Sequence, residues 1–163
     1  MKKNILRTIL MLLLLSTFFI IFGFSSQNGE KSGNISKKIT EEIITRIPQI
    51  QEKEQNEREA ISLRIEKVIR KIAHFSIYTA VGLLLMALIS TFEMKEKNRI
   101  IISLIIGIIY ACSDEIHQSF VPERSPMITD VMIDTMGVML GILLIMLGKA
   151  IIKKYKKNSK EMV

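Results

Sequence analysis

The sequence is poor in tryptophan, cysteine and recognisable catalytic motifs. It has no tryptophan among its 163 residues, so anchoring at a membrane surface falls to tyrosine, lysine and arginine. The single cysteine, Cys112, cannot form a disulfide within the chain, and no Cys/His spacing typical of a zinc site is present. G-x-S-x-G, HExxH and phosphatase-type motifs are also missing, so the sequence indicates no particular reaction.

Apolar residues are gathered in long blocks. The chain is 48% hydrophobic and 24% charged, which indicates apolar blocks separated by polar segments. Four blocks come close to the roughly 20 residues that a membrane-spanning helix needs. They cover residues 5–24, 72–92, 100–120 and 127–148. A soluble bundle would need a polar face on each helix, and residues 79–92 and 100–112 have almost none. The sequence therefore predicts an all-α polytopic membrane protein, with residues 1–163 forming one domain.

The first block has two possible interpretations. Basic residues lie at its start, namely Lys2, Lys3 and Arg7, which is also typical of a secretory signal peptide. The block is long, however, and the FGFSSQ at its end has no A-x-A-like cleavage site. We therefore expect a retained transmembrane helix.

The distribution of lysine and arginine predicts the orientation of the helices. Basic residues gather before the first block, between the second and third, and after the fourth, whereas VPERSP, between the third and fourth, carries only Arg124. Such basic flanks belong on the cytoplasmic side. We therefore expect a multi-pass protein of the plasma membrane with its N-terminus and its basic tail, residues 149–163, in the cytoplasm. This assigns most of the net charge of +7 to topology and anionic lipid, and it argues against nucleic acid as a partner.

The long connection, residues 25–71, is expected to be extracytoplasmic and partly helical. Isoleucines four residues apart in NISKKITEEIITRI form one helical face. Either Asn34 or Ser36 can cap this helix, and Pro48 follows its end. A second apolar stripe, in ISLRIEKVIRKI, leads into the second span. We expect the two stripes to pack on each other or on the outer membrane surface.

With this topology, the ionisable groups inside the spans form one layer near the outer surface. The only two histidines, His74 and His117, lie there together with Asp114, Asp130 and Asp134. At 1.5 Å per residue, all five lie within about 10 Å of the outer helix ends. A carboxylate inside a membrane is unfavourable, by roughly 2.5–3.5 kcal/mol at mid-helix, unless it is bonded or neutralised. A single such residue can reach the headgroups, but the whole group predicts an outward-facing polar pocket.

Helical spacing indicates which of these groups share a face. Asp114, His117 and Gln118 lie three or four residues apart on one face, and Glu115 points about 100° away from Asp114. On the fourth block, Asp130 and Asp134 continue into a GxxxG-type close-approach surface. The glycines of that surface are Gly137 and Gly141. Positive side chains that can pair with the acids lie at the same rim, namely Arg70, Lys71 and Arg124.

Together these motifs resemble those of the VanZ-like membrane proteins. RKIAHFSIYTAVGLLL is similar to the family's R-K-x-x-H-F-x-x-Y segment. SDEIHQSFVPERSPMITDVMIDTMGVMLG contains its D-E-x-H-Q-x-F-x-P-x-R and D-x-x-x-D/N-x-x-G-x-x-x-G patterns, and FSSQNGEKSGNIS resembles the segment after its first helix. The resemblance covers about Phe22 to Gly141. Many relatives have Glu where this chain has Ile77, and Gly where it has Glu123.

The resemblance implies a process more than a reaction. The family is named after a protein that lowers susceptibility to teicoplanin, a lipid-tailed glycopeptide antibiotic that acts on external cell-wall precursors. This implies a role in antibiotic resistance at the cell envelope, and whether the chain is an enzyme stays open. The signature positions implied for this chain are Arg70, Lys71, His74, Tyr78, Asp114, Glu115, His117, Gln118, Pro122, Arg124, Asp130, Asp134, Gly137 and Gly141.

Three functions fit these observations. The first is binding of a lipid, a lipid-linked envelope precursor or a lipoglycopeptide. The second is an outer-leaflet hydrolase or transferase, with His74 or His117 as acid or base and Asp114 or Asp130 orienting it. A divalent metal held by His and Asp is a variant of this reading, and no other cofactor is indicated. The third is a proton-coupled transporter, which needs a homo-oligomer through the Gly137 and Gly141 face. Predicted ligand-binding residues are Arg70, Lys71, Tyr78, Glu115, Gln118, Arg124 and Asp134.

Overall fold

The computed structural model describes residues 1–26, 29–122 and 126–161. These residues contain helices and no strand. The helices are α1 (Lys2–Ser25), α2 (Gly29–Thr45), α3 (Pro48–Gln51), α4 (Gln55–Ile89), α5 (Glu96–Gln118) and α6 (Ile128–Glu161). Four of them, α1, α4, α5 and α6, are long and apolar enough to cross a membrane. The predicted all-α polytopic membrane fold is therefore confirmed.

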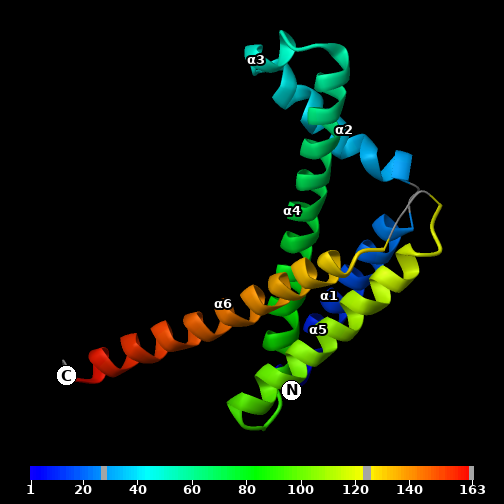
Figure 1. The fold of residues 1–163 in the computed structure, drawn as a ribbon. Helices are drawn as coiled ribbons and strands as arrows, with labels where there is room; N and C mark the ends of the chain where they lie inside the picture. Colours follow the sequence, from blue (N-terminus) through cyan, green and yellow to red (C-terminus); the bar gives the residue numbers. More distant parts are fainter. Residues whose placement is uncertain (27–28, 123–125, 162–163) are drawn as a thin grey trace.

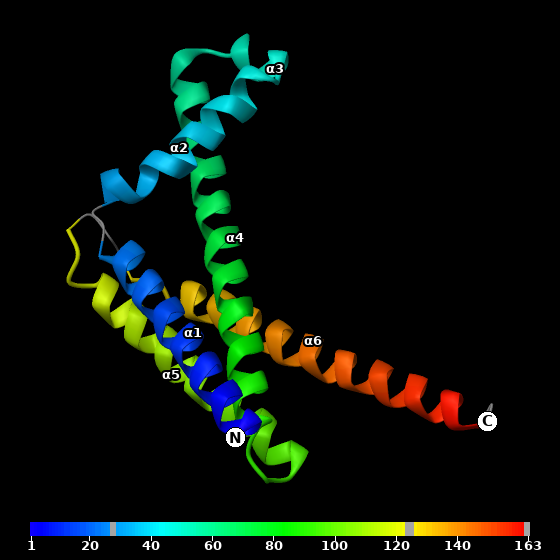
Figure 2. The ribbon, with the colours of Figure 1, turned by 180° about the vertical axis from the view of Figure 1, so that it is seen from behind.

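The central element is α4, which contacts α1, α2, α5 and α6. Helices α1 and α5 lie side by side along one flank of α4, and α6 crosses α4 and runs away from it toward the C-terminus (Figure 1). Seen from behind, α1 lies against α5, and α2 lies beside the other half of α4, with the short α3 at its end (Figure 2). The part of α4 that carries the crossing is thus enclosed by three other helices.

Helix α4 is longer than a membrane requires. Its 35 residues span about 52 Å at 1.5 Å per residue, whereas the hydrocarbon core is about 30 Å thick. The predicted apolar stripe and the second span therefore form one unbroken helix, and α2 packs against its N-terminal half. The predicted cap of the preceding helix at Asn34 or Ser36 is wrong, because α2 already begins at Gly29. Its end agrees with the prediction, since Pro48 starts α3.

Glycines allow α4 and α6 to approach closely. A Cβ atom at Gly82 of α4 would overlap the backbone of Val138, and one at Gly141 of α6 would overlap the backbone of α4 at Thr79. Gly137 lies in the same way against Phe75 of α4. The GxxxG-type face is therefore occupied within the chain. The transporter hypothesis needs these glycines on a free surface where a second copy of the chain can bind, and the structure places them against α4.

The end of the bundle opposite α2 and α3 collects the basic flanks. Arg7 of α1 donates from Nε to the Thr91 hydroxyl (3.0 Å) and from a terminal nitrogen to the Thr91 carbonyl (2.8 Å). Its guanidinium also lies 4.3 Å from the centroid of the Phe92 ring. Lys149 of α6 donates to the Ser90 hydroxyl at 2.7 Å. Cations from α1 and α6 thus bind the C-terminal end of α4, where a helix carries partial negative charge.

Replacement of Arg7 by lysine is expected to loosen α1 from α4. Lysine keeps the charge but loses the paired hydrogen bonds and the stacking on the Phe92 ring. Hydrogen bonds from charged donors contribute about 1.5–3 kcal/mol, so we expect the free energy of unfolding to fall by about that amount. The measurement is the fraction that stays monodisperse in detergent after heating. Lys3→Ala, which removes an exposed ion pair with Glu93, is the matched control. Equal melting curves for Arg7→Lys and Lys3→Ala would contradict the assignment.

Candidate functional site

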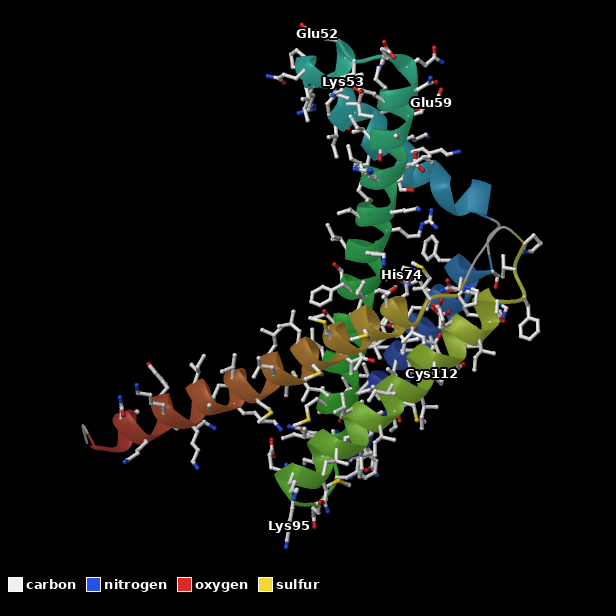
Figure 3. The ribbon with its side chains drawn as sticks, in the orientation of Figure 1. Glu52, Lys53, Glu59, His74, Lys95 and Cys112 are labelled. Carbon is white, nitrogen blue, oxygen red and sulfur yellow. The ribbon has the colours of Figure 1, made fainter. Side chains whose placement is uncertain are left out.

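Side chains from three transmembrane helices meet where α6 crosses α4. We call them the polar cluster: His74 and Tyr78 on α4, Asp114 and Gln118 on α5, and Asp134 on α6. Ligand atoms of His74, Asp114 and Asp134 all lie within 4.8 Å of one another. Figure 3 shows His74 on α4 just beside this crossing, far from Lys95 at the basic end. The structure thus brings together residues that are up to 60 positions apart in the sequence.

The Asp114 carboxylate is held in place by a chain of hydrogen bonds. Gln118 Nε2 donates to Asp114 Oδ2 at 3.0 Å, and it also lies 3.3 Å from the Ser25 hydroxyl oxygen at the end of α1. All three residues are buried. Because Gln118 lies one helical turn beyond Asp114, its amide reaches the carboxylate without distorting α5. The side chain of Asp114 is therefore fixed from the α1 side.

The Asp134 carboxylate, by contrast, is poorly satisfied. Only 2% of Asp134 is exposed, and its Oδ1 atom accepts no hydrogen bond from any described residue. The Nδ1 atom of His74 lies 3.6 Å from Asp134 Oδ1, which is too long for a good hydrogen bond. The hydroxyl of Tyr78 is also fully buried, close to both acids. Buried polar atoms without partners are rare in stable interiors and mark this point as exceptional.

Among the described residues, no lysine or arginine forms an ion pair with the acids of the polar cluster. Within the described residues, Asp114 forms no ion pair, and Asp134 has only the histidine contact. Lys71, the nearest lysine in sequence, is engaged by Asp130 at 2.7 Å. Buried carboxylates near a low-dielectric membrane need a counter-charge, a proton or water. The arrangement of the cluster can therefore accommodate a cation, a proton or water.

A cavity of about 270 Å³ opens beside the cluster, between α1, α2 and α4. Its polar lining consists of Ser25, Ser36, Arg70 and His74, and the rest is apolar. Apolar lining residues are Ile21, Phe24, Ile39, Ile69, Ala73 and Ile77. The Nε atom of Arg70 is buried with no hydrogen-bond partner among the described residues. His74 lies beside Asp134, and Ser25 contacts Gln118, which donates to Asp114, so the cavity lining is connected to both buried acids.

The other predicted site residues have separate partners. Asp130 and Lys71 form a half-exposed ion pair one helical turn from Asp134. Glu115 is buried and accepts a hydrogen bond from the Met127 backbone N–H at 2.5 Å, at the start of α6. His117 does not join His74. Its Nε2 lies 3.0 Å from the Ser26 hydroxyl and its ring stacks on Phe22 at 4.3 Å, both on the α1 segment. Arg124 lies outside the described residues.

Sequence reasoning missed what α1 and α2 contribute to the site. Ser25 and Ser26 contact Gln118 and His117 on α5, and Ser36 lines the cavity from α2. Tyr110 of α5 donates from its hydroxyl to the Phe18 carbonyl of α1 at 2.8 Å. The adjacent Ser25 and Ser26 at the end of the first apolar block could have indicated this contribution, because polar side chains at the end of a span can bind polar side chains of neighbouring spans.

The arrangement can perform two kinds of chemistry. A neutral His74 imidazole, next to the Asp134 carboxylate and open to the cavity, can accept a proton from water or from a ligand. The Arg70 guanidinium can bind an anionic group in the same cavity. The apolar lining can hold a hydrocarbon chain next to that group.

Comparison with known proteins gives one match. The model of the family described as VanZ/LLP1 matches residues 9–151, a range that includes every member of the polar cluster and of the cavity lining. No curated protein and no solved structure matches the chain.

Proposed function

Because the chain belongs to the VanZ-like family of membrane proteins, we propose that its cavity binds a phosphate-bearing lipid, such as a lipid-linked cell-envelope precursor. The observation that carries this proposal is the combination of one apolar wall with Arg70 and His74 in a single cavity of about 270 Å³. A phosphate attached to a hydrocarbon chain has the same two features. The guanidinium binds phosphate through paired N–H donors, and the isoleucines contact the chain.

The positions of the basic flanks support an outward-facing site. Lys3 and Arg7 of α1 contact the segment after α4, and Lys149 of α6 contacts the same segment. All three flanks therefore lie at one end of the bundle, as the positive-inside rule requires of cytoplasmic ends. The polar cluster and the cavity lie toward the other end. On this basis the termini are cytoplasmic and the cavity opens to the outer leaflet of the plasma membrane.

A role in glycopeptide resistance would follow from the same site. Teicoplanin carries a lipid tail and acts on external precursors, so a protein that binds either molecule changes how much antibiotic reaches its target. A lipoglycopeptide shares the apolar chain with the precursor but lacks its phosphate. Competition between the two for the cavity would therefore depend on the apolar lining more than on Arg70.

Hydrolysis of the bound phosphate is the second candidate function. It is favoured by the position of His74, which lines the cavity and lies 3.6 Å from Asp134. His74 would take a proton from water, whose oxygen forms a bond to phosphorus while the phosphorus bond to the leaving oxygen breaks, and the imidazolium would then give that proton to the leaving oxygen. Asp134 would stabilise the imidazolium that results, and Arg70 the charge on the phosphate oxygens.

The binding proposal is tested with the full chain in nanodiscs of zwitterionic lipid. We expect a short polyprenyl phosphate to bind and the corresponding polyprenol to bind at least tenfold more weakly, because a charged hydrogen bond contributes about 1.5–3 kcal/mol. Arg70→Gln should remove that preference. Arg46→Gln, which removes an exposed arginine paired with Glu42 outside the cavity, is the control. Released phosphate is measured in the same samples. Equal binding of the phosphate and the alcohol would overturn the proposal.

A further inference from the structure

We infer that His74, Asp114 and Asp134 form a binding site for one divalent transition-metal cation. The three residues come from α4, α5 and α6, and their ligand atoms lie within 4.8 Å of one another. Bonds of 2.0–2.2 Å to a shared ion place ligand atoms about 3–4 Å apart. Side-chain rotations that close the group by about 1 Å are therefore enough, and no helix has to move. This inference concerns the cation alone and does not require that a lipid phosphate binds.

An independent observation points to a ligand at this place. The Oδ1 atom of Asp134 is buried without a hydrogen-bond donor among the described residues, on a side chain of which 2% is exposed. Asp134 is held there by the approach of α6 to α4 through Gly137, one turn further along. An unsatisfied buried carboxylate is destabilising by itself, by about 1–3 kcal/mol or more. A cation bound to Oδ1 removes that penalty.

The surroundings of Asp114 match the outer shell of a metal site. Gln118 donates to Oδ2 of Asp114 and is itself linked to Ser25, so the carboxylate is oriented before any ion arrives. Metal-binding carboxylates are usually fixed by such outer hydrogen bonds. The adjacent acids are not free to compete, because Glu115 accepts from Met127 and Asp130 pairs with Lys71. The geometry therefore selects three ligands from a larger group of acids.

The ligand types restrict the choice of ion. One imidazole and two carboxylates suit Mn²⁺, Fe²⁺, Co²⁺ or Zn²⁺ better than Ca²⁺ or Mg²⁺, which prefer oxygen ligands alone. No thiolate takes part, since Cys112 is exposed on α5. Two carboxylates and a neutral imidazole carry a charge of −2, which one divalent ion neutralises. Three protein ligands leave at least one coordination position of the ion open for water or a phosphate oxygen. Because His74 lines the cavity, a ligand in the cavity can reach that position.

The test is a titration of the full chain with Mn²⁺. The protein is placed in nanodiscs of zwitterionic lipid, stripped with EDTA and freed of chelator, and bound Mn²⁺ is followed by its EPR signal. We expect one Mn²⁺ per chain, displaced by Zn²⁺. Asp134→Asn is expected to weaken binding at least about 100-fold, because loss of an outer-shell partner alone costs 10–100-fold. Gln118→Ala removes such a partner and should weaken Mn²⁺ binding by about 10–100-fold.

The matched control is Asp130→Asn, on the same helix and one turn from Asp134. It removes a half-exposed carboxylate that pairs with Lys71, and it should leave Mn²⁺ affinity unchanged within about twofold. If Asp134→Asn fails to fold, His74→Gln carries the test, since a quarter of that side chain (24%) is exposed. Absence of stoichiometric Mn²⁺ and Zn²⁺, or equal weakening by Asp130→Asn, would overturn the inference. Lipid binding measured in EDTA separates this result from that of the proposed function.

Discussion

Gly141→Ala is expected to destabilise the helix bundle, and Gly148→Ala, seven residues further along α6, is expected to stabilise it. The added Cβ at position 141 would overlap the backbone of α4 at Thr79, Gly82 and Leu83, so one of the two helices has to shift. At Gly148 the same atom meets nothing within 4 Å. Alanine is favoured over glycine in a helix by about 1 kcal/mol, and this gain operates at both positions.

Whether Gly141→Ala stabilises or destabilises depends on how far the backbone of α4 can move away from the added Cβ atom. Inserting a group into a packed interior typically destabilises by about 1–3 kcal/mol, and more when backbone is displaced. We therefore expect a net loss of at least about 1 kcal/mol for Gly141→Ala and a gain of up to about 1 kcal/mol for Gly148→Ala. The measurement is resistance to denaturation in mixed detergent micelles containing rising amounts of SDS. If both variants shift the midpoint in the same direction, α4 and α6 do not cross as closely as described.

Much of the fold was predictable because membranes impose simple rules. Long apolar runs predict helices α1, α5 and α6, and the basic flanks predict which of their ends lie on a common side. The continuity of α4 was not predicted. Its N-terminal half is amphipathic and therefore has the composition of a surface segment, although it continues without a break into the span. Composition marks where a helix enters the membrane, but it does not mark where the helix begins.

The site was predictable in its depth and not in its partners. The layer that contains His74, Asp114 and Asp134 follows from helix length alone. Which residues within the layer meet depends on how each helix is rotated, and sequence spacing leaves the rotation of one helix against another undetermined. His117 shares a face with Asp114 along α5, yet it turns to Ser26 and Phe22 because α1 packs on that side. The glycines of α6 likewise indicated a close contact without identifying α4 as the partner.

The close crossing and the unsatisfied acid are two parts of one arrangement. Gly137 and Gly141 bring α6 against α4, and this approach carries Asp134 into a position where no described residue donates a hydrogen bond to its Oδ1 atom. The packing free energy of the crossing therefore maintains a local arrangement that is unfavourable. Retention of such a group is expected where function requires it, since function and stability often conflict at binding sites.

Asp134→Asn is therefore expected to make the metal-free protein more stable and to abolish function. Asparagine has nearly the same shape, and it removes one of two carboxylates that lie within 4.8 Å of each other. At an effective dielectric constant of about 20, two such charges repel by roughly 3 kcal/mol, so we expect a gain of about 1–3 kcal/mol in EDTA. A purely structural carboxylate would behave in the opposite way, because its replacement would weaken the contact with His74.

The same pair of proteins separates stability from binding. Adding Mn²⁺ at 100 times the wild-type Kd should stabilise the wild-type protein by about 2.7 kcal/mol, and it should stabilise Asp134→Asn by no more than about 0.4 kcal/mol. Phosphate release from a polyprenyl phosphate, if the wild type shows it, should be lost in the variant. Asp130→Asn should change stability by no more than about 1 kcal/mol, because its ion pair with Lys71 is half-exposed. A variant that is more stable, blind to Mn²⁺ and inactive would identify Asp134 as a ligand. A less stable one would make it part of the scaffold.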